Sequence, residues 1–192
     1  MKKLVKESLF EISLEGSNLE RMGLGYRNNI KRWLEEMGFE NFTYTINDDL
    51  FINVTANVNL NERLSEHRLP PFIKFKEVYG NFWCYGNELT SLEGCPNTVR
   101  GSFSCHRNSL TSLKGCPNTV KEGFYCYSNE LVSLEGCPDT LNNDFYCYNN
   151  ELVSLEGCPN TVNGDFWCFN NKRTFTEEEV RAICKVKGKI KV

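Results

Sequence analysis

The clearest pattern in the chain is a set of apolar positions that recur every 21 residues between residues 80 and 171. Each unit reads F-x-C-x-x-N-x-L-x-S-L-x-G-C-P-x-x-V/L, and four complete units are followed by a fifth, partial one. The period predicts a solenoid, because one such unit cannot bury its own apolar face whereas stacked units can. The most regular positions are Phe82, Phe103, Phe124, Phe145 and Phe166; Cys84, Cys105, Cys126, Cys147 and Cys168; and Asn87, Asn108, Asn129, Asn150 and Asn171.

The spacing inside one unit predicts which side chains point inward. Phe82 and Cys84 stand two residues apart, so in a strand their side chains point to the same side. Leu89, Leu92 and Val99 follow neither the period of a strand nor that of a helix. They suit a chain that turns corners and sends one apolar group inward on each leg.

Two polar features complete the unit. Gly94, before a Cys-Pro pair, predicts a tight turn, since glycine reaches dihedral angles that other residues avoid and proline cannot donate a hydrogen bond. Asn87 and its equivalents are expected to be structural, because a buried amide can bond the backbone of a tight turn and stacked copies can bond each other.

The unit resembles the leucine-rich repeat, whose core is L-x-L-x-x-N-x-L-x-x-L, with Phe and Cys in the two strand positions. Its length is similar to that of the short bacterial class, with units of about 20–22 residues. The S-L-E-G-C-P variant, the Lys-rich start and the Ile46-Asn47-Asp48-Asp49-Leu50 segment look like those of uncharacterised proteins of large tailed bacteriophages. The expected fold is therefore an α/β-type, mainly-β leucine-rich-repeat solenoid with a parallel sheet on one face and helical caps at both ends.

The N-terminal region is predicted to form a cap and a degenerate first unit. Residues 25–37 predict a helix that Gly38 ends, with Ile30, Trp33, Leu34 and Met37 on one face. Alternation over 50–60 predicts strands, with Val58 and Leu60 in the Phe and Cys positions, although this turn is a few residues longer than the others. The proposed division is a helical cap over 1–45 and a degenerate first repeat over 46–79, before the repeats at 80–171.

The C-terminal region, 172–192, is predicted to be a helical cap with a basic tail. Thr176 and Glu179 form a capping box, from which a helix of about ten residues should begin. We expect Val180, Ile183 and Cys184 to cover the last turn of the solenoid. The lysines at 185, 187, 189 and 191 are expected to form a solvated terminus rather than a nucleic-acid arm.

Composition narrows the setting. No run of about 18 apolar residues occurs, so no membrane span is expected, and the basic start lacks the apolar core of a signal peptide. The ten cysteines are evenly spaced in a chain without an export signal, which favours reduced thiols and a cytoplasmic location, in the bacterial host cell if the protein is phage-encoded.

The variable residues between the repeated ones are the candidates for function. If Phe82 and Cys84 point inward, their strand neighbours point outward and form two columns about 19 Å long at about 4.8 Å per turn. Arg107 flanks them. Ser104 aside, the candidate partner-binding residues of these columns are Trp83, Tyr85, His106, Tyr125, Tyr127, Tyr146, Tyr148, Trp167 and Phe169.

Two interpretations of the outward aromatics remain open. Cross-strand aromatic pairs stabilise a sheet, but exposed apolar patches and Tyr and Trp side chains also mark interaction sites. Residues 80–171 hold four basic and ten acidic residues, a net charge of −6, which disfavours single-stranded nucleic acid because that ligand needs a positive groove. A protein partner fits best, a glycan less well, and self-association through the aromatic face is a further option.

The sequence offers no site for chemistry. The cysteine spacings alternate between 11 and 10 and give two lines rather than a tetrahedron, so no metal and no cofactor is expected. Adjacent thiols of one column could oxidise in air, because the spacing of the turns is near the disulfide Cα range. His106 is adjacent to Cys105 on a strand, so the two side chains point apart.

We therefore predict a non-enzymatic interaction module that binds a host or phage protein, for example to inhibit a host defence or regulatory factor. The alternative is a phage structural protein or glycan-binding adhesin. A third hypothesis, an enzyme with a site at the N-terminal cap, requires Asp48 or Asp49 to meet His67 in a cleft.

Overall fold

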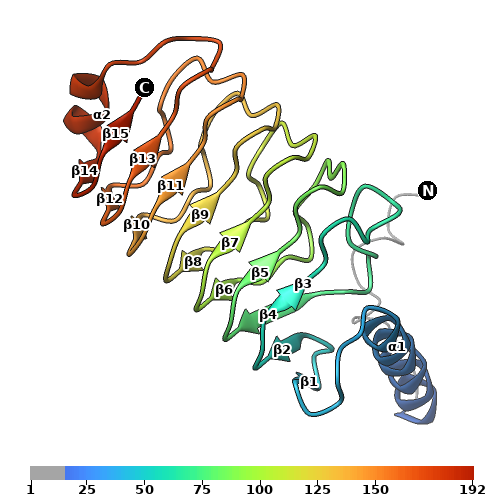
Figure 1. Cartoon of the computed structure of the whole chain (residues 1–192). Coiled ribbons are helices and arrows are strands. Elements are labelled where there is room, and N and C mark those ends of the chain that lie inside the picture. Colours follow the sequence, from blue (N-terminus) through green and yellow to red (C-terminus); the bar gives the residue numbers. More distant parts are fainter. Residues whose placement is uncertain (1–15) are drawn as a thin grey trace.

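The computed structural model describes residues 16–192 and shows a mainly-β parallel solenoid of about seven turns (Figure 1). Each turn contributes one short strand to a seven-stranded sheet, called here the first sheet. Its strands pair in parallel and in register, so equivalent residues of successive turns lie side by side. In sheet order they are β15 (Ile190–Lys191), β13 (Phe166–Trp167), β11 (Phe145–Tyr146), β9 (Phe124–Tyr125), β7 (Phe103–Ser104), β5 (Phe82–Trp83) and β3 (Val58–Asn59).

The structure also has a second set of strands. Within the repeats these strands follow the Cys-Pro turns, where the sequence had predicted only an inward valine or leucine. This second sheet is divided into a five-stranded and a three-stranded part, and only β1 and β2 pair antiparallel. The Thr-Val and Thr-Leu pairs in these strands have β-branched or aliphatic side chains that favour extended backbone. In sheet order the strands are β1 (Tyr44–Ile46), β2 (Ile52–Val54), β4 (Phe75–Val78), β6 (Thr98–Val99) and β8 (Thr119–Val120), and then β10 (Thr140–Leu141), β12 (Thr161–Val162) and β14 (Lys185–Val186).

The core lies between the two sheets and contains the residues that the sequence assigned to it. The repeated phenylalanines and cysteines of the first sheet are at most 1 % exposed, and Leu89, Leu92 and Val99 are equally buried. Neighbouring phenylalanine rings of the repeats lie 5.2–6.0 Å apart between centroids. The inward orientation of Phe82 and Cys84 is thus confirmed.

The repeated asparagines tie successive turns together. Asn129 donates from Nδ2 to the carbonyl oxygens of Cys126 in its own turn and Cys105 in the preceding one, both at 3.1 Å. Its Oδ1 accepts from the backbone N–H of Leu110. The predicted bond to the turn backbone is confirmed, but the amides bond the backbone of the neighbouring turn rather than each other.

Left-handed backbone marks the corners of the solenoid. Gly94 has φ +90°, and a Cβ there would lie 2.5 Å from the carbonyl oxygen of Ile73. The corner that follows each strand of the first sheet, except β15, also has positive φ, and one of these six corner residues is a glycine. These corner residues are Glu62, Gly86, Arg107, Ser128, Asn149 and Asn170.

At the N-terminal end, α1 (Gly16–Glu36) begins nine residues earlier than the sequence predicted, because the helix continues through Gly23 and Gly25. The predicted apolar face is confirmed, since Ile30, Trp33 and Leu34 are buried and Met37 is partly buried against the core. Val58 pairs with Phe82 at a separation of 24 rather than 21 residues, which confirms the longer first turn. Part of the predicted 1–45 cap, residues 1–15, lies outside the described residues.

At the C-terminal end, the capping box of Thr176 and Glu179 is confirmed and begins α2 (Glu177–Ile183), which is shorter than predicted. Val180 and Cys184 are buried, but the prediction for Ile183 was wrong: it is 49 % exposed, because a seven-residue helix buries only one narrow stripe. The expected solvated lysine tail was also wrong in part. Its backbone forms β14 and β15, although the lysine side chains are exposed.

Candidate interaction surface

The outward residues of the first sheet form two neighbouring columns, together called the aromatic face. One column holds Trp83, Ser104, Tyr125, Tyr146 and Trp167, and the other holds Tyr85, His106, Tyr127, Tyr148 and Phe169. All are partly buried except Ser104, which is 4 % exposed. The structure therefore brings together every outward residue that the sequence singled out, and Arg107 lies exposed at the adjacent corner.

The second column is a continuous stack, called here the aromatic ladder. Its five rings, from Tyr85 to Phe169, are separated by 4.2–4.5 Å between centroids and inclined by 7–18°. The Nζ of Lys191 lies 4.3 Å from the Phe169 centroid and covers the C-terminal end of the stack. Because ring faces meet ring faces, the ladder offers ring edges and hydroxyl groups to a partner.

The first column is less regular, because Ser104 interrupts it. Tyr146 stacks on Trp167 at 4.4 Å and 15°, but Tyr125 meets Tyr146 at a tilt of 54°. Within residues 16–192, no aromatic ring pairs with Trp83. Ring faces are thus covered by neighbouring rings more completely in the second column than in the first.

His106 is held in the ladder as a neutral ring. Its Nδ1 lies 2.8 Å from the Oγ of Ser104, and the flanking rings are Tyr85 and Tyr127. Burial, helped by the positive charge of Arg107, lowers the pKa of His106 to about 4. The sequence correctly placed His106 and Cys105 on opposite sides, but it missed Ser104 as a partner, although the two-residue spacing on one strand was the available signal.

Negative charge collects along the C-terminal half of the aromatic face. Asp144 accepts the hydroxyl of Tyr146 at 3.1 Å and the backbone N–H of Asp165 at 2.8 Å. Burial raises the pKa of Tyr146, and the carboxylates of Asp144 and Asp165 raise it further. Burial and Asp144 likewise raise the pKa of Tyr125.

The cysteines are free thiols. Burial raises the pKa of both Cys116 and Cys168 to about 12, and that of Cys158, one of the two partly exposed cysteines, also to about 12. Such thiols carry little thiolate at neutral pH and are poor nucleophiles and poor metal ligands. In the described part of the chain, no group of three or more His, Cys, Asp or Glu side chains is placed to hold a metal ion.

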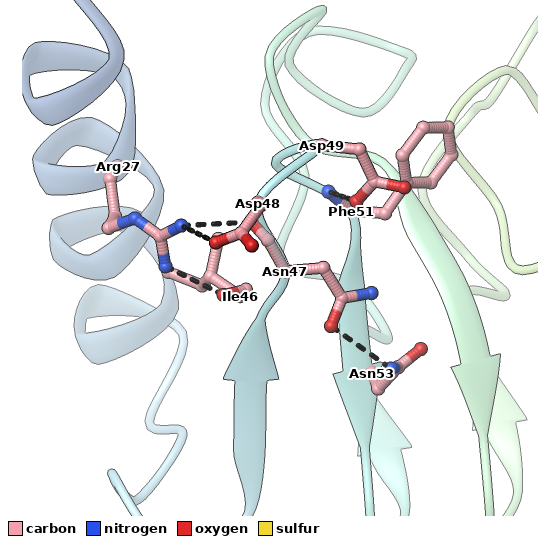
Figure 2. A network of polar contacts seen from close by, with 7 residues as sticks. All are labelled: Arg27, Ile46, Asn47, Asp48, Asp49, Phe51 and Asn53. Carbon is pink, nitrogen blue, oxygen red and sulfur yellow. Dashed lines mark hydrogen bonds and ion pairs between the residues drawn. The ribbon is translucent and has the colours of Figure 1, made fainter. Parts of the chain in front are cut away.

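Asp48 and Asp49 lie in the turn between β1 and β2, whose backbone is bound by Arg27 of α1 (Figure 2). Arg27 donates to the carbonyl oxygens of Ile46 and Asn47 at 2.6 and 2.9 Å, and it lies 3.7 Å from the fully exposed Asp48. Asp49 accepts the backbone N–H of Phe51, and Lys76 lies 3.9 Å from it. His67 lies instead 3.4 Å from Glu88. These contacts give no support to the hypothesis of an Asp–His site.

One hollow lies at the N-terminal end of the first sheet, and no residue of the aromatic ladder lines it. It has a volume of about 270 Å³ and is lined mainly by the segment after α1 and by the turn around β3. Arg63 crosses this region and donates to the carbonyl oxygens of Met37 and Glu36, which closes the end of the helix. Its guanidinium is therefore engaged in structure.

Comparisons with protein-family models, with curated proteins and with solved structures found no match to the chain. Among the residues from 16 onward, no helix is long and apolar enough to cross a bilayer.

Proposed function

We propose that the protein is a non-enzymatic interaction module that binds another protein through its aromatic face. The observation that carries this proposal is the unbroken ladder from Tyr85 to Phe169, beside the first column with Trp83 and Trp167. Tyr and Trp are the side chains most often found at binding hot spots. A regular parallel sheet holds them in fixed positions, so little conformational entropy is lost on binding.

The stacking geometry favours a protein over a flat ligand. A sugar or a base binds an aromatic side chain through a free ring face. From His106 to Phe169, ring faces of the ladder are covered by neighbouring rings and, at Phe169, by Lys191, whereas the outer face of Tyr85 and the ring of Trp83 have no aromatic neighbour among the residues that the structure describes. Most of the ladder therefore offers ring edges and hydroxyls, which suits the mixed polar and apolar surface of a protein better than a flat sugar or base.

The likeness to leucine-rich repeats, the roles of α1 and α2 as caps, and a cytoplasmic setting with a host or phage protein as partner belong to the same proposal. They rest on the sequence pattern. The buried Trp33, 6.5 Å from Phe75 between ring centroids, supports a capping role for α1, and the buried Val180 does so for α2.

The test is capture of partners by the tagged chain from cells that express it, with quantitative mass spectrometry. Tyr127→Ser combined with Tyr148→Ser removes two rings of the ladder. The matched control, Thr119→Ala with Thr161→Ala, changes two outward residues of the second sheet. We expect a partner that the control retains and the ladder variant loses, with both variants folded by circular dichroism. Retention of every captured protein by the folded ladder variant contradicts the proposal.

A further inference from the structure

The charges around the aromatic face are unevenly distributed along it. Asp144 and Asp165 lie on the same outward side of the chain as Tyr146 and Trp167, two residues before each of them. The exposed Glu130 follows Tyr127 beyond the corner residue, and Glu151 follows Tyr148 in the same way. We call Glu130, Asp144, Glu151 and Asp165 the acidic rim. It borders both sides of the C-terminal half of the aromatic face.

The N-terminal half of the aromatic face carries different charges. Arg107 is exposed at the corner next to His106, and its charge disfavours protonation of that ring. The acidic rim has no counterpart there on the side of the first column, because Asn57, Asn81 and Ser102 occupy the positions of Asp144 and Asp165. On the ladder side, Glu88 lies at the equivalent of Glu130 and is 3.4 Å from His67. The charge difference between the two halves is therefore carried by the side of the first column and by Arg107.

The chain itself places a cation against this half of the face. The ammonium group of Lys191 lies 4.3 Å from the centroid of Phe169 and 5.3 Å from that of Trp167. These are cation–π distances. Lys172 likewise lies 4.0 Å from Glu151. The rim carboxylates and the tyrosine hydroxyls can accept hydrogen bonds from ammonium and guanidinium groups.

From this arrangement we infer that the C-terminal half of the aromatic face docks a basic, Arg- or Lys-containing segment of a protein partner. The inference rests on the proposed function and deepens it by naming the chemistry of the partner. Charge complementarity sets the orientation, since basic side chains are attracted to the acidic rim and repelled by Arg107. Exposed charges act here mainly on specificity and association rate, so the interaction weakens as salt rises.

The structure offers a conservative way to remove the charge. Asp144 and Asp165 each accept a backbone N–H from the next turn, at 2.8 and 2.7 Å. Asn57 and Asn81 likewise accept a backbone N–H from the turn that follows each of them. Asparagine therefore fits this column. The triple variant E130Q/D144N/D165N removes three charges from the rim. The control E93Q/E135Q/E156Q removes three exposed charges from the Leu-Glu-Gly corners, away from the first sheet.

The probe is a fluorescent decapeptide of alternating arginine and serine, compared by anisotropy with a glutamate–serine decapeptide at about 50 and about 300 mM salt. We expect the wild-type chain to bind the arginine peptide at least about tenfold more tightly than the glutamate peptide, and less tightly at the higher salt. The rim variant should lose about tenfold in affinity, the control less than about twofold, and Arg107→Ala should gain about twofold. Equal losses in rim variant and control, or no preference for the arginine peptide, overturn the inference.

The captured partner separates this inference from the proposed function. If the partner is lost from Tyr127→Ser/Tyr148→Ser but retained by E130Q/D144N/D165N, the aromatic face binds and its preference for a basic segment is wrong. If both variants retain it, both proposals fail. Loss from both variants, with retention by E93Q/E135Q/E156Q, supports both.

Discussion

The two sheets of the solenoid are built from the same turns, yet they differ in continuity. The first sheet is unbroken over seven strands, whereas the second is interrupted between β8 and β10. Among the described residues, no backbone hydrogen bond joins 119–121 to 140–142, although equivalent bonds join Thr119 to Asn97 and Thr161 to Asp139. Both sheets share one core, so burial alone does not explain the difference.

Side-chain ladders distinguish the first sheet. Its strands carry stacked phenylalanines inward and stacked aromatic rings outward, and the asparagines bond successive turns at its corner. The outward residues of the second sheet are mostly threonines, without such stacking. The comparison indicates that stacked side chains on both faces of the first sheet keep its two-residue strands in register. Five substitutions test this account, in order from the largest expected effect to the smallest.

The inner phenylalanine ladder should contribute most. Phe124→Ala removes a fully buried ring between Phe103 and Phe145 and should lower the free energy of unfolding by about 3–5 kcal/mol. Val120→Ala, in the second sheet, should cost about 2 kcal/mol. Urea unfolding measures both. An equal or larger effect at Val120 contradicts the ranking of the two sheets.

The asparagine ladder should come next. Asn129→Ala leaves the carbonyl groups of Cys105 and Cys126 and the N–H of Leu110 without their partner, so we expect a loss of about 2–3 kcal/mol. Asn143→Ala, an exposed asparagine beyond β10, should change stability by less than about 0.5 kcal/mol. Similar losses in the two variants would show that the buried amide is not a tie between turns.

The aromatic ladder should contribute less than the core. The ring centroid of Tyr127 lies 4.3 Å from that of His106 and 4.5 Å from that of Tyr148. Tyr127→Ala should therefore lower the free energy of unfolding by about 1–3 kcal/mol. Tyr127→Phe keeps the ring and should be nearly neutral. Thr119→Ala on the second sheet should also have a small effect. If thermal unfolding shows Tyr127→Phe as destabilised as Tyr127→Ala, the hydroxyl and not the stack is responsible.

The histidine of the ladder should make stability depend on pH. The pKa of His106 is lowered to about 4 in the fold, against 6.5 for an ordinary histidine. Between these values the unfolded chain binds a proton that the folded chain excludes, so stability falls as pH falls from 6.5 to 4. After allowance for solvent screening, the contribution of His106 is about 1–2 kcal/mol. In His106→Tyr this part of the pH dependence should disappear; an unchanged profile in urea titrations at pH 7 and pH 4.5 contradicts it.

The corner that ends the first sheet should give the smallest effect. Arg107 has φ +52°, which costs free energy for a residue with a Cβ, and Gly86 occupies the equivalent position. Arg107→Gly should therefore raise the free energy of unfolding by up to about 1 kcal/mol. Asn149→Gly should gain less, because asparagine tolerates this conformation. Destabilisation by Arg107→Gly in a thermal melt would falsify the assignment of strain to this corner.

Much of the fold follows from the repeat. The repeat spacing alone predicted that Phe82, Cys84 and Asn87 point inward. It could do so because the turns pair in register, and the same residue type therefore recurs at the same position of every turn. The second sheet was missed, since a strand such as Thr98–Val99 has a single inward apolar residue, whereas Phe82 and Cys84 give each unit of the first sheet two inward residues spaced by two. Near the ends, Ile183 and the last lysines were misassigned because they lack the support of neighbouring copies.

The sequence predicted which residues belong to the aromatic face, but not how their rings are oriented. The alternation of the strands identified all the outward residues. It did not show that the rings of the ladder would lie face to face, nor that Ser104 would be buried beside His106. Ring orientation depends on side-chain packing between turns, which a single sequence does not specify.

Hydroxyl-radical footprinting of the chain, alone and with its captured partner, tests the central claim most directly. If the aromatic face is the binding surface, oxidation of Tyr127, Tyr148 and Trp167 should decrease in the complex, while that of Tyr79, beside the second sheet, should stay the same. Protection at Tyr79 without protection of the ladder residues would contradict the claim.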